Sequence, residues 1–266
     1  MMAQGYKAAG IAMPLLPAQS VISILGIDAT TAAQASALLD AGYNVICADA
    51  DPEKVEALSR QIERTAPGGL RGLARGCASS ALRVTDDPLM AIIDSDVTVI
   101  CQGASQNFLG EMDTYVLSAM GRTIGAALAH KAGFHVIIQQ AATEPGTTRG
   151  VLLPAIEAAS GLRAGVDFGL CHMSDRLEAE GDAAAEDLLP VMLGVTDAQT
   201  ARRLDVIFTA IGMQATVSTL EVSEMTSSLP SRSRAFPWAG KPAAQSDLRS
   251  GRHMLFPLKA AFATPA

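Results

Sequence analysis

The stretch VISILGIDATTAAQASALLDAGYNVICAD (21–49) decides the fold that we expect for this chain. Its first six residues, VISILG (21–26), form a continuous apolar run that is typical of a buried strand. The Ala-rich segment 31–41 has a helical composition and stops at Gly42, a residue type that commonly follows the last turn of a helix. A second apolar run, YNVICAD (43–49), follows. The stretch therefore predicts a strand, a short turn, a helix and a second strand.

The same alternation continues along the chain. Asp51 and Pro52 open the next expected helix as its N-cap and its first residue, and this helix runs to residue 64. We expect further helices at 87–96, 115–131, 147–160 and 197–212, and further strands at 81–87, 97–103, 134–140, 166–171, 190–195 and 214–220. A Gly-rich loop is expected at 66–76, and a loop or helix at 175–188. This order predicts an α/β protein with a Rossmann-like, doubly wound, mainly parallel sheet and helices on both faces.

The pattern divides the chain into three parts: an N-terminal extension (1–20), the Rossmann-like domain (21–225) and an irregular basic tail (226–266). Aromatic residues make up only 4% of the 266 residues, so we expect a core of small aliphatic side chains. The tail reads as a solvated segment or, alternatively, as a contact for a phosphate or a partner, through Arg232, Arg234, Lys241, Arg249 and Arg252.

Composition also limits the partners. The net charge of −7 makes nucleic acid an unexpected ligand, because an acidic protein repels the phosphate backbone. No apolar run reaches the roughly 18 residues of a membrane-spanning helix. The four cysteines lack the spacing of a metal site, as do His130, His135 and His253, so we expect no metal and a reduced, cytoplasmic protein.

The turn after the first strand is where a Rossmann domain binds the diphosphate of its cofactor, through glycines and the N-terminus of a helix. Here Gly26 stands at the first glycine position, but Asp28 and Thr31 occupy the other two. A carboxylate at Asp28 repels phosphate and adds bulk, and it is also a good helix cap. Asp49 ends the second strand, 23 residues after Gly26. That spacing fits the acid that binds the adenosine ribose, although an Asp that simply begins the following turn fits as well.

Several segments together carry a family resemblance. They are ISILG with LLDAGYNVICADADPEKVEAL, DSDVTVICQG with GEMD, HVIIQQAATEPGTTRGVLLPAIEAASGLRAGVDFG, and LEVSEM. From residue 21 to about 225 the chain resembles the N-terminal, NAD-binding half of the UDP-glucose/GDP-mannose dehydrogenase family, most closely its GDP-mannose 6-dehydrogenase branch. The resemblance implies NAD as cofactor. It also implies a cofactor site that includes Gly26, Asp28, Asp49, Lys54, Gly103 and Thr147.

The positions that the resemblance assigns to catalysis are altered. Ala141 and Ala142 replace a Ser-Thr pair, Asp175 replaces a Glu, and Ser227 replaces a Lys. Pro242 stands near the place of the nucleophilic Cys, and we find no counterpart of the C-terminal sugar-binding domain. We therefore expect NAD binding to be weakened or lost, and no nucleotide-sugar oxidation. The remaining catalytic candidates are Asp175 and its neighbour His172, which form an acid–base pair or are simply structural residues.

Three functions remain open on the sequence. The first is a non-catalytic subunit that binds a nucleotide or nucleotide sugar, or pairs with a full-length dehydrogenase or another protein, in the exopolysaccharide context that the family implies. The second is an active NAD-dependent oxidoreductase with altered chemistry. The third is a homo-oligomerising module that exposes an apolar surface. We favour the first.

Overall fold

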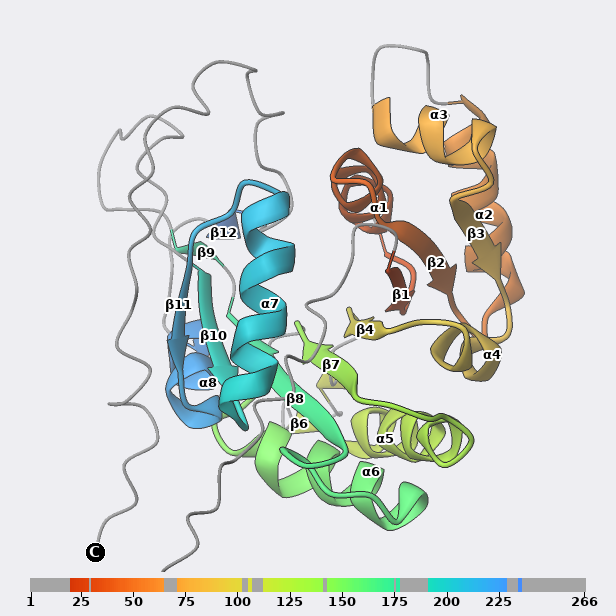
Figure 1. The fold of residues 1–266 in the computed structure, drawn as a ribbon. Coiled ribbons are helices and arrows are strands. Elements are labelled where there is room, and N and C mark those ends of the chain that lie inside the picture. The colour runs from red at the N-terminus through yellow and green to blue at the C-terminus, as the bar shows by residue number, and fades with distance from the viewer. Residues whose placement is uncertain are drawn as a thin grey trace, which may run out of the picture.

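The computed structural model describes residues 20–28, 30–64, 71–101, 105–106, 112–140, 143–174, 176–177, 191–228 and 234–235. Its main feature is an eight-stranded sheet with the strand order β11-β10-β8-β7-β4-β1-β2-β3 (Figure 1). Two short two-stranded pairs accompany it: β5 (Ser105–Gln106) with β6 (Met112–Asp113), and β9 (Arg176–Leu177) with β12 (Arg234–Ala235). The described part of the predicted tail thus contributes β12.

The first six strands of the sheet are parallel and form the doubly wound part: β1 (Val21–Leu25), β2 (Asn44–Ala48), β3 (Leu82–Thr85), β4 (Val97–Ile100), β7 (His135–Gln139) and β8 (Phe168–Met173). The order reverses between β1 and β4, so this is the switch point at which an open α/β sheet forms a crevice at the carboxyl ends of its strands. The predicted fold class is confirmed.

The last two strands extend the sheet beyond β8. β10 (Val191–Val195) runs antiparallel to β8, with Leu193 opposite Met173, and β11 (Ala215–Ser218) runs parallel to β10. Within the eight-stranded sheet this is the one antiparallel pair, which agrees with the expectation of a mainly parallel sheet.

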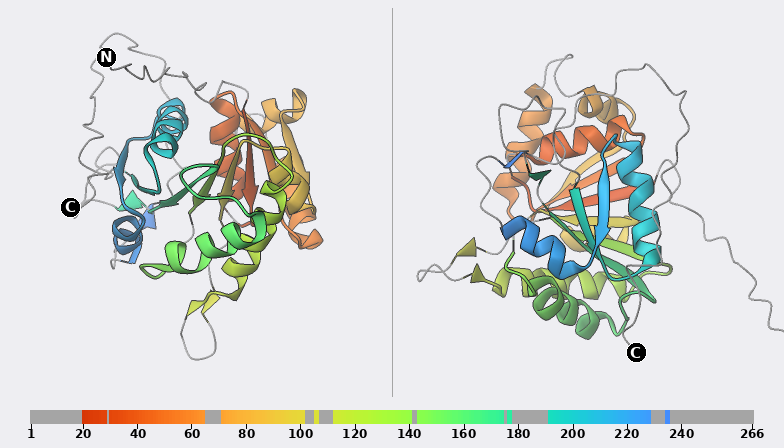
Figure 2. Two further views of the ribbon diagram at one scale, coloured as in Figure 1. Left: turned by 60° about the horizontal axis from the view of Figure 1, so that its bottom comes forward. Right: turned by 90° about the vertical axis from the view of Figure 1, so that its left-hand side faces the viewer.

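Helices cover both faces of the sheet, as Figure 2 shows from two further sides. One face carries α1 (Thr31–Asp40), α2 (Pro52–Arg64), α3 (Arg71–Ala78) and α7 (Ala198–Ala210). The other face carries α4 (Pro88–Ile93), α5 (Tyr115–Leu128), the π-helical turn η1 (Thr148–Leu152) and α6 (Leu153–Ser160). The short helix α8 (Leu220–Ser228) packs on β8, β10 and η1. None of the described helices is long and apolar enough to cross a membrane.

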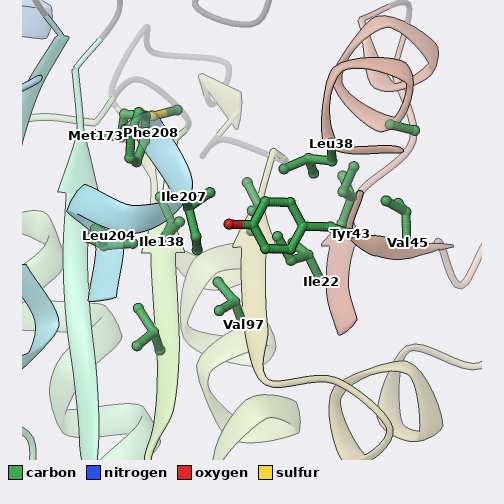
Figure 3. Close-up of a cluster of buried hydrophobic side chains, with 14 of the residues drawn as sticks. Ile22, Leu38, Tyr43, Val45, Val97, Ile138, Met173, Leu204, Ile207 and Phe208 are labelled. Atoms are coloured by element: carbon green, nitrogen blue, oxygen red, sulfur yellow. The ribbon is translucent and has the colours of Figure 1, made fainter. Parts of the chain in front are cut away.

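The core is mostly aliphatic, as the composition predicts. Figure 3 shows the cluster beneath α1 and α7, in which Tyr43, just before β2, is 3% exposed and points into the cluster. Around it lie side chains from both sheet and helices: Ile22, Leu38, Val45, Val97, Ile138, Met173, Leu204, Ile207 and Phe208.

The prediction of a loop at 66–76 was wrong for residues 71–76, because this part of the chain belongs to α3. Two glycines of that helix are in close contact with α1. A Cβ atom built on Gly72 would lie 2.0 Å from the carbonyl oxygen of Ser36, and one on Gly76 would lie 2.7 Å from Leu39 Cδ1. These glycines allow two helices to approach closely. Tertiary packing thus overrides the low helix propensity that suggested a loop.

The end of the domain also differs from the expectation. The last strand was predicted to reach residue 220, but Leu220 begins α8, which continues to Ser228. Leu220, Ser223 and Glu224 are fully buried against the sheet and the loop after β7. Leu220, Ser223 and Glu224 are buried by contacts with distant parts of the chain. The sequence of α8 has no clear amphipathic periodicity, so the pattern of residues did not predict the helix.

Candidate nucleotide-binding site

The turn between β1 and α1 is held together by the carboxylate of Asp28. Its Oδ1 atom accepts hydrogen bonds from the backbone nitrogens of Thr30 (2.7 Å) and Thr31 (3.0 Å), and also from both threonine hydroxyls. In return, the backbone N–H of Asp28 donates to the Thr31 hydroxyl over 2.9 Å. Gly26 supplies the positive φ of 88° at which the strand turns. The N-cap residue of α1 is Thr30, so Asp28 is not itself the cap residue; its carboxylate lies just before the helix and binds the amides at its start.

The Asp28 carboxylate binds the backbone amides with which the turn of a Rossmann domain binds a diphosphate. The N-terminal amides of α1 are the donors that a diphosphate would otherwise receive. Two of them, at Thr30 and Thr31, already point to a carboxylate of the protein itself.

Asp49 lies at the end of β2 and is 7% exposed. Its Oδ2 atom accepts hydrogen bonds from the backbone nitrogen of Ile27 (2.8 Å) and from Lys54 Nζ (3.2 Å). Its Oδ1 atom accepts one from the backbone nitrogen of Asp51 (3.0 Å). Asp49 therefore joins the end of β2 to the turn after β1 and to the first turns of α2.

Four of the predicted cofactor residues are thus neighbours: Gly26 and Asp28 in the turn, and Asp49 with Lys54 beside it. Asp51 caps α2 through the backbone nitrogen of Glu53, at 2.9 Å, as the sequence predicts.

A second polar group, which the sequence analysis missed, lies at the switch point. Cys101 follows β4 and donates its thiol to Gln34 Oε1 of α1 over 3.1 Å. The Gln34 side-chain amide also donates to Gln140 Oε1, after β7, over 3.3 Å. Burial and then the charge of Asp28 raise the pKa of Cys101 well above its ordinary value, so the thiol stays protonated. The available signal was the position of Cys101 and Gln140 directly after buried strands.

Thr147 lies in the loop after β7 and is 7% exposed. This loop closes around Glu224 of α8, a fully buried carboxylate. Glu224 accepts hydrogen bonds from the backbone nitrogens of Gly146 (2.6 Å) and Thr148 (2.7 Å). The sequence analysis noted LEVSEM as a motif but did not find this contact, which joins residues far apart in the chain.

Of the two catalytic candidates, His172 is the one that lies within the described residues. His172 lies in β8, is fully buried, and its Nδ1 atom is 2.9 Å from the hydroxyl of Ser223. That surrounding suits a structural histidine. Asp175 and Gly103 lie outside the described residues, so their predicted roles stay predictions. Ser227, at the position of the expected Lys, is 4% exposed, and its hydroxyl donates to the Ser223 carbonyl over 3.5 Å.

Comparison with known proteins places this geometry in a family. The model of the UDP-glucose/GDP-mannose dehydrogenase family, NAD binding domain, matches residues 20–212. GDP-mannose 6-dehydrogenase of Pseudomonas aeruginosa is 31% identical over 206 residues, which are 77% of this chain and 47% of that protein. The corresponding enzyme of Pseudomonas putida is 29% identical over the same share of each chain. The chain spans about half the length of these relatives.

Solved structures agree with the sequence comparison. The crystal structure of a ternary complex of GDP-mannose dehydrogenase from Pseudomonas aeruginosa has a TM-score of 0.67 at 32% identity, covering 77% of this chain and 48% of that one. UDP-glucose dehydrogenase from Pyrobaculum islandicum has a TM-score of 0.64, covering 78% and 48%; at 24% identity it supports the fold alone. The chain therefore belongs to the UDP-glucose/GDP-mannose dehydrogenase family, and its described sheet corresponds to the NAD-binding domain of that family.

Proposed function

We propose that this protein is a non-catalytic relative of the nucleotide-sugar 6-dehydrogenases, in which the NAD-binding domain acts as a nucleotide- or protein-binding regulatory subunit. The observation that carries the proposal is the Asp28 carboxylate at the N-terminus of α1, which accepts the amides of Thr30 and Thr31. The same position in a dinucleotide-binding turn receives a diphosphate.

The cost of this substitution to a dinucleotide has two parts. A phosphate must compete with an intramolecular carboxylate for the same donors, and it is repelled by the charge of that carboxylate. Two unit charges about 4 Å apart repel by roughly 1 kcal/mol in water and about 4 kcal/mol at an effective dielectric constant near 20. Asp28 is exposed, so the smaller value applies, which corresponds to about a fivefold loss of affinity per phosphate charge. We therefore propose weakened NAD binding.

The replaced catalytic positions support the non-catalytic part of the proposal. A dehydrogenase of this family type needs charged groups close to the reacting carbon, because charge develops there during hydride transfer and hydrolysis. Ser227 is buried and hydrogen-bonded to its own helix, and so it supplies no such charge. His172 is buried on Ser223. The family context extends the proposal to exopolysaccharide synthesis, with a complete dehydrogenase as the expected partner.

The decisive experiment is an assay for NADH formation with NAD and either GDP-mannose or UDP-glucose. We expect no NADH above the rate of a buffer control. The Asp49→Asn variant serves as the control for contaminating dehydrogenase, because it alters the expected ribose contact of this chain only. NADH formed by the wild type and lost in Asp49→Asn would overturn the proposal.

The regulatory part is tested separately, by adding the chain to a complete GDP-mannose 6-dehydrogenase. A change in that enzyme's rate, or a stable complex in size-exclusion chromatography, is the expected result for a protein-binding subunit. If neither appears, the protein-binding branch is rejected and the nucleotide branch remains.

The alternative function is an active NAD-dependent oxidoreductase acting on a CH–OH group of a nucleotide sugar or another substrate. The presence of Asp49 at the ribose position, and of the Gln34–Cys101–Gln140 group at the switch point, favours it. This alternative requires NAD to bind despite Asp28. An Asp28→Gly exchange should then strengthen NAD binding, whereas no effect would indicate a pocket that is closed for other reasons.

A further inference from the structure

The helix α8 has polar side chains on its buried face and apolar side chains on its exposed face. The buried positions recur every three or four residues and form one face: Leu220, Ser223, Glu224 and Ser227. Three of these four are polar. The opposite face presents Val222 and Met225, which are 44% and 58% exposed and form what we call the α8 surface. A helix at the surface of a globular protein normally has the reverse arrangement, so the α8 surface has the composition of a surface that is covered.

Polar contacts border the α8 surface on both sides. Successive residues of a helix are about 100° apart, which places Glu221 on one flank of the apolar strip and Thr226 on the other. Glu221 pairs with Arg149. The Thr226 hydroxyl donates to Met192 Sδ, on β10, over 3.4 Å. The α8 surface is therefore a narrow apolar strip, wide enough for one or two large side chains.

The chain returns to this part of the fold after α8 ends at Ser228. The strand β12 pairs with β9, and β9 contacts β10, the strand on which α8 packs (Figure 1). β12 therefore lies close to the part of the sheet that carries α8. Phe236 and Trp238, which lie outside the described residues, follow β12 within three residues, a reach of about 10 Å.

The composition of the tail (226–266) differs from that of a purely solvated segment. The tail holds four of the eleven aromatic residues of the sequence, and aromatic side chains favour burial on an apolar surface. Its six basic residues and one acid give a net charge of +5, whereas residues 21–225, with 13 basic and 26 acidic residues, carry −13. Opposite net charges attract the tail to its own domain, and the covalent connection holds it there at a roughly millimolar effective concentration.

We propose that the tail segment 236–238 binds the α8 surface of the same chain, with the side chains of Phe236 and Trp238 covering Val222 and Met225. Aromatic rings bring a large apolar area, and a Met thioether packs favourably against them. Of the roles that the sequence left open for the tail, this makes it a contact whose partner is the chain's own domain. The inference does not depend on the proposed function, because the α8 surface faces away from the sheet and from the loop after β7.

The fluorescence of Trp238 tests the contact directly, because it is the one Trp of the sequence. The measurements are the emission maximum of the full chain and the quenching of that emission by acrylamide, with the chain unfolded in urea as the reference. We expect the native emission to be shifted to the blue and its quenching constant to be severalfold lower than in urea. A bound indole ring is shielded from both water and quencher.

A double variant locates the contact on α8. Val222→Gln together with Met225→Gln replaces two exposed apolar side chains by a polar one of good helix propensity, so α8 should stay folded, which circular dichroism verifies. Its emission should shift to the red, and its quenching constant should rise towards the value in urea. The matched control is Met90→Gln, at an exposed Met of α4 near the other end of the sheet, which should change neither quantity. If the double variant loses helix, Met225→Gln alone should give a smaller red shift.

Each result decides the inference. A native Trp238 that is as exposed as in urea would overturn it, because the segment would not be bound. A protected Trp238 that the α8 variants leave unchanged would also overturn it, because the segment would be bound elsewhere. Protection that is lost on dilution, with dimers seen by light scattering, would assign the α8 surface to a second copy of the chain and reject the intramolecular contact. NADH formation would refute the proposed function and leave this inference unaffected.

Discussion

The Oε1 atom of Glu224 lies 2.7 Å from the backbone nitrogen of Thr148, so a helix near the end of the described domain caps the helix that follows β7. Gly146 N–H donates to the other carboxylate oxygen. The arrangement repeats what Asp28 does at α1, where a carboxylate of the chain also occupies a helix N-terminus. A negative charge is favourable at both places, because the first amides of a helix lack partners within it. In both cases the anion is the protein's own.

Removing the Glu224 charge should destabilise the fold. In Glu224→Gln, one oxygen is replaced by an NH2 group that faces a backbone donor in a fully buried site. We expect the free energy of unfolding to fall by about 2–4 kcal/mol, measured by urea denaturation with circular dichroism. The control is Glu221→Gln on the same helix, whose ion pair with Arg149 is exposed and should contribute less than about 1 kcal/mol. Equal stabilities of the two variants would contradict the capping role.

The close packing of α1 on α3 predicts a sharp difference between two glycines. In Gly72→Ala the new Cβ atom meets backbone atoms of Ser36, which have no rotamer to change. We expect a loss of about 2 kcal/mol or more in the free energy of unfolding. A Cβ atom added to Gly150, in η1, would meet nothing within 4 Å, so Gly150→Ala should leave stability unchanged or raise it by about 0.5–1 kcal/mol. The prediction fails if Gly72→Ala is as stable as Gly150→Ala.

The fold was largely predictable from sequence because each buried strand is a continuous apolar run bounded by turn residues. The failures share one cause. The helix α3 depends on Gly72 and Gly76 meeting α1, and α8 depends on Glu224 meeting the loop after β7. Both conditions are contacts between segments distant in the chain, and no local pattern expresses them.

Some residues of the candidate site could likewise be identified from the sequence, and others could not. Asp28 and Asp49 were identifiable because a fixed distance from the first strand determines their positions, and the contacts of Asp28 are local to its turn. The group formed by Gln34, Cys101 and Gln140 was not identifiable. Its members come from a helix and two strand ends, separated by 67 and 106 residues. Only the three-dimensional order of the strands brings them together.

Burial of His135 predicts a loss of stability in mild acid. Desolvation, and next the charge of Lys131, lower the pKa of His135 from 6.5 to about 3 in the folded protein. Between pH 6.5 and about pH 3, His135 is protonated in the unfolded chain and neutral in the folded chain. The free energy of unfolding should therefore fall as the pH drops from 6.5 towards 3, by up to about 1.4 kcal/mol per pH unit from this group.

The variant that tests this is His135→Gln, compared with the wild type by urea denaturation at several pH values. Its stability should depend less steeply on pH across this window, even if it is less stable overall through loss of the contact with Thr98. His130→Gln, at an exposed position, should keep the slope of the wild type. If the free energy of unfolding of His135→Gln depended on pH as steeply as that of the wild type, His135 would not be the group responsible.

The four cysteines should differ strongly in their reaction with a thiol reagent. Cys77 is exposed at the end of α3, whereas Cys47 and Cys171 are fully buried. Burial raises the pKa of Cys47 to about 12 and raises the pKa of Cys171 as well, so their thiolates are scarce at neutral pH. We expect a single fast thiol in the native protein, absent in Cys77→Ser, and slower labelling of the others by about a hundredfold or more.

Cys101 makes this experiment informative about the site. The residue is partly exposed, yet its thiol contacts Gln34 and burial raises its pKa, so Cys101 should belong to the slow group. In Gln34→Ala the side chain in contact with the thiol is shortened, so Cys101 should become more accessible and its labelling faster, while Cys77 is unaffected. A second fast thiol in the wild type would show that the Gln34–Cys101 contact does not persist in solution, and the switch-point group would then lose its support.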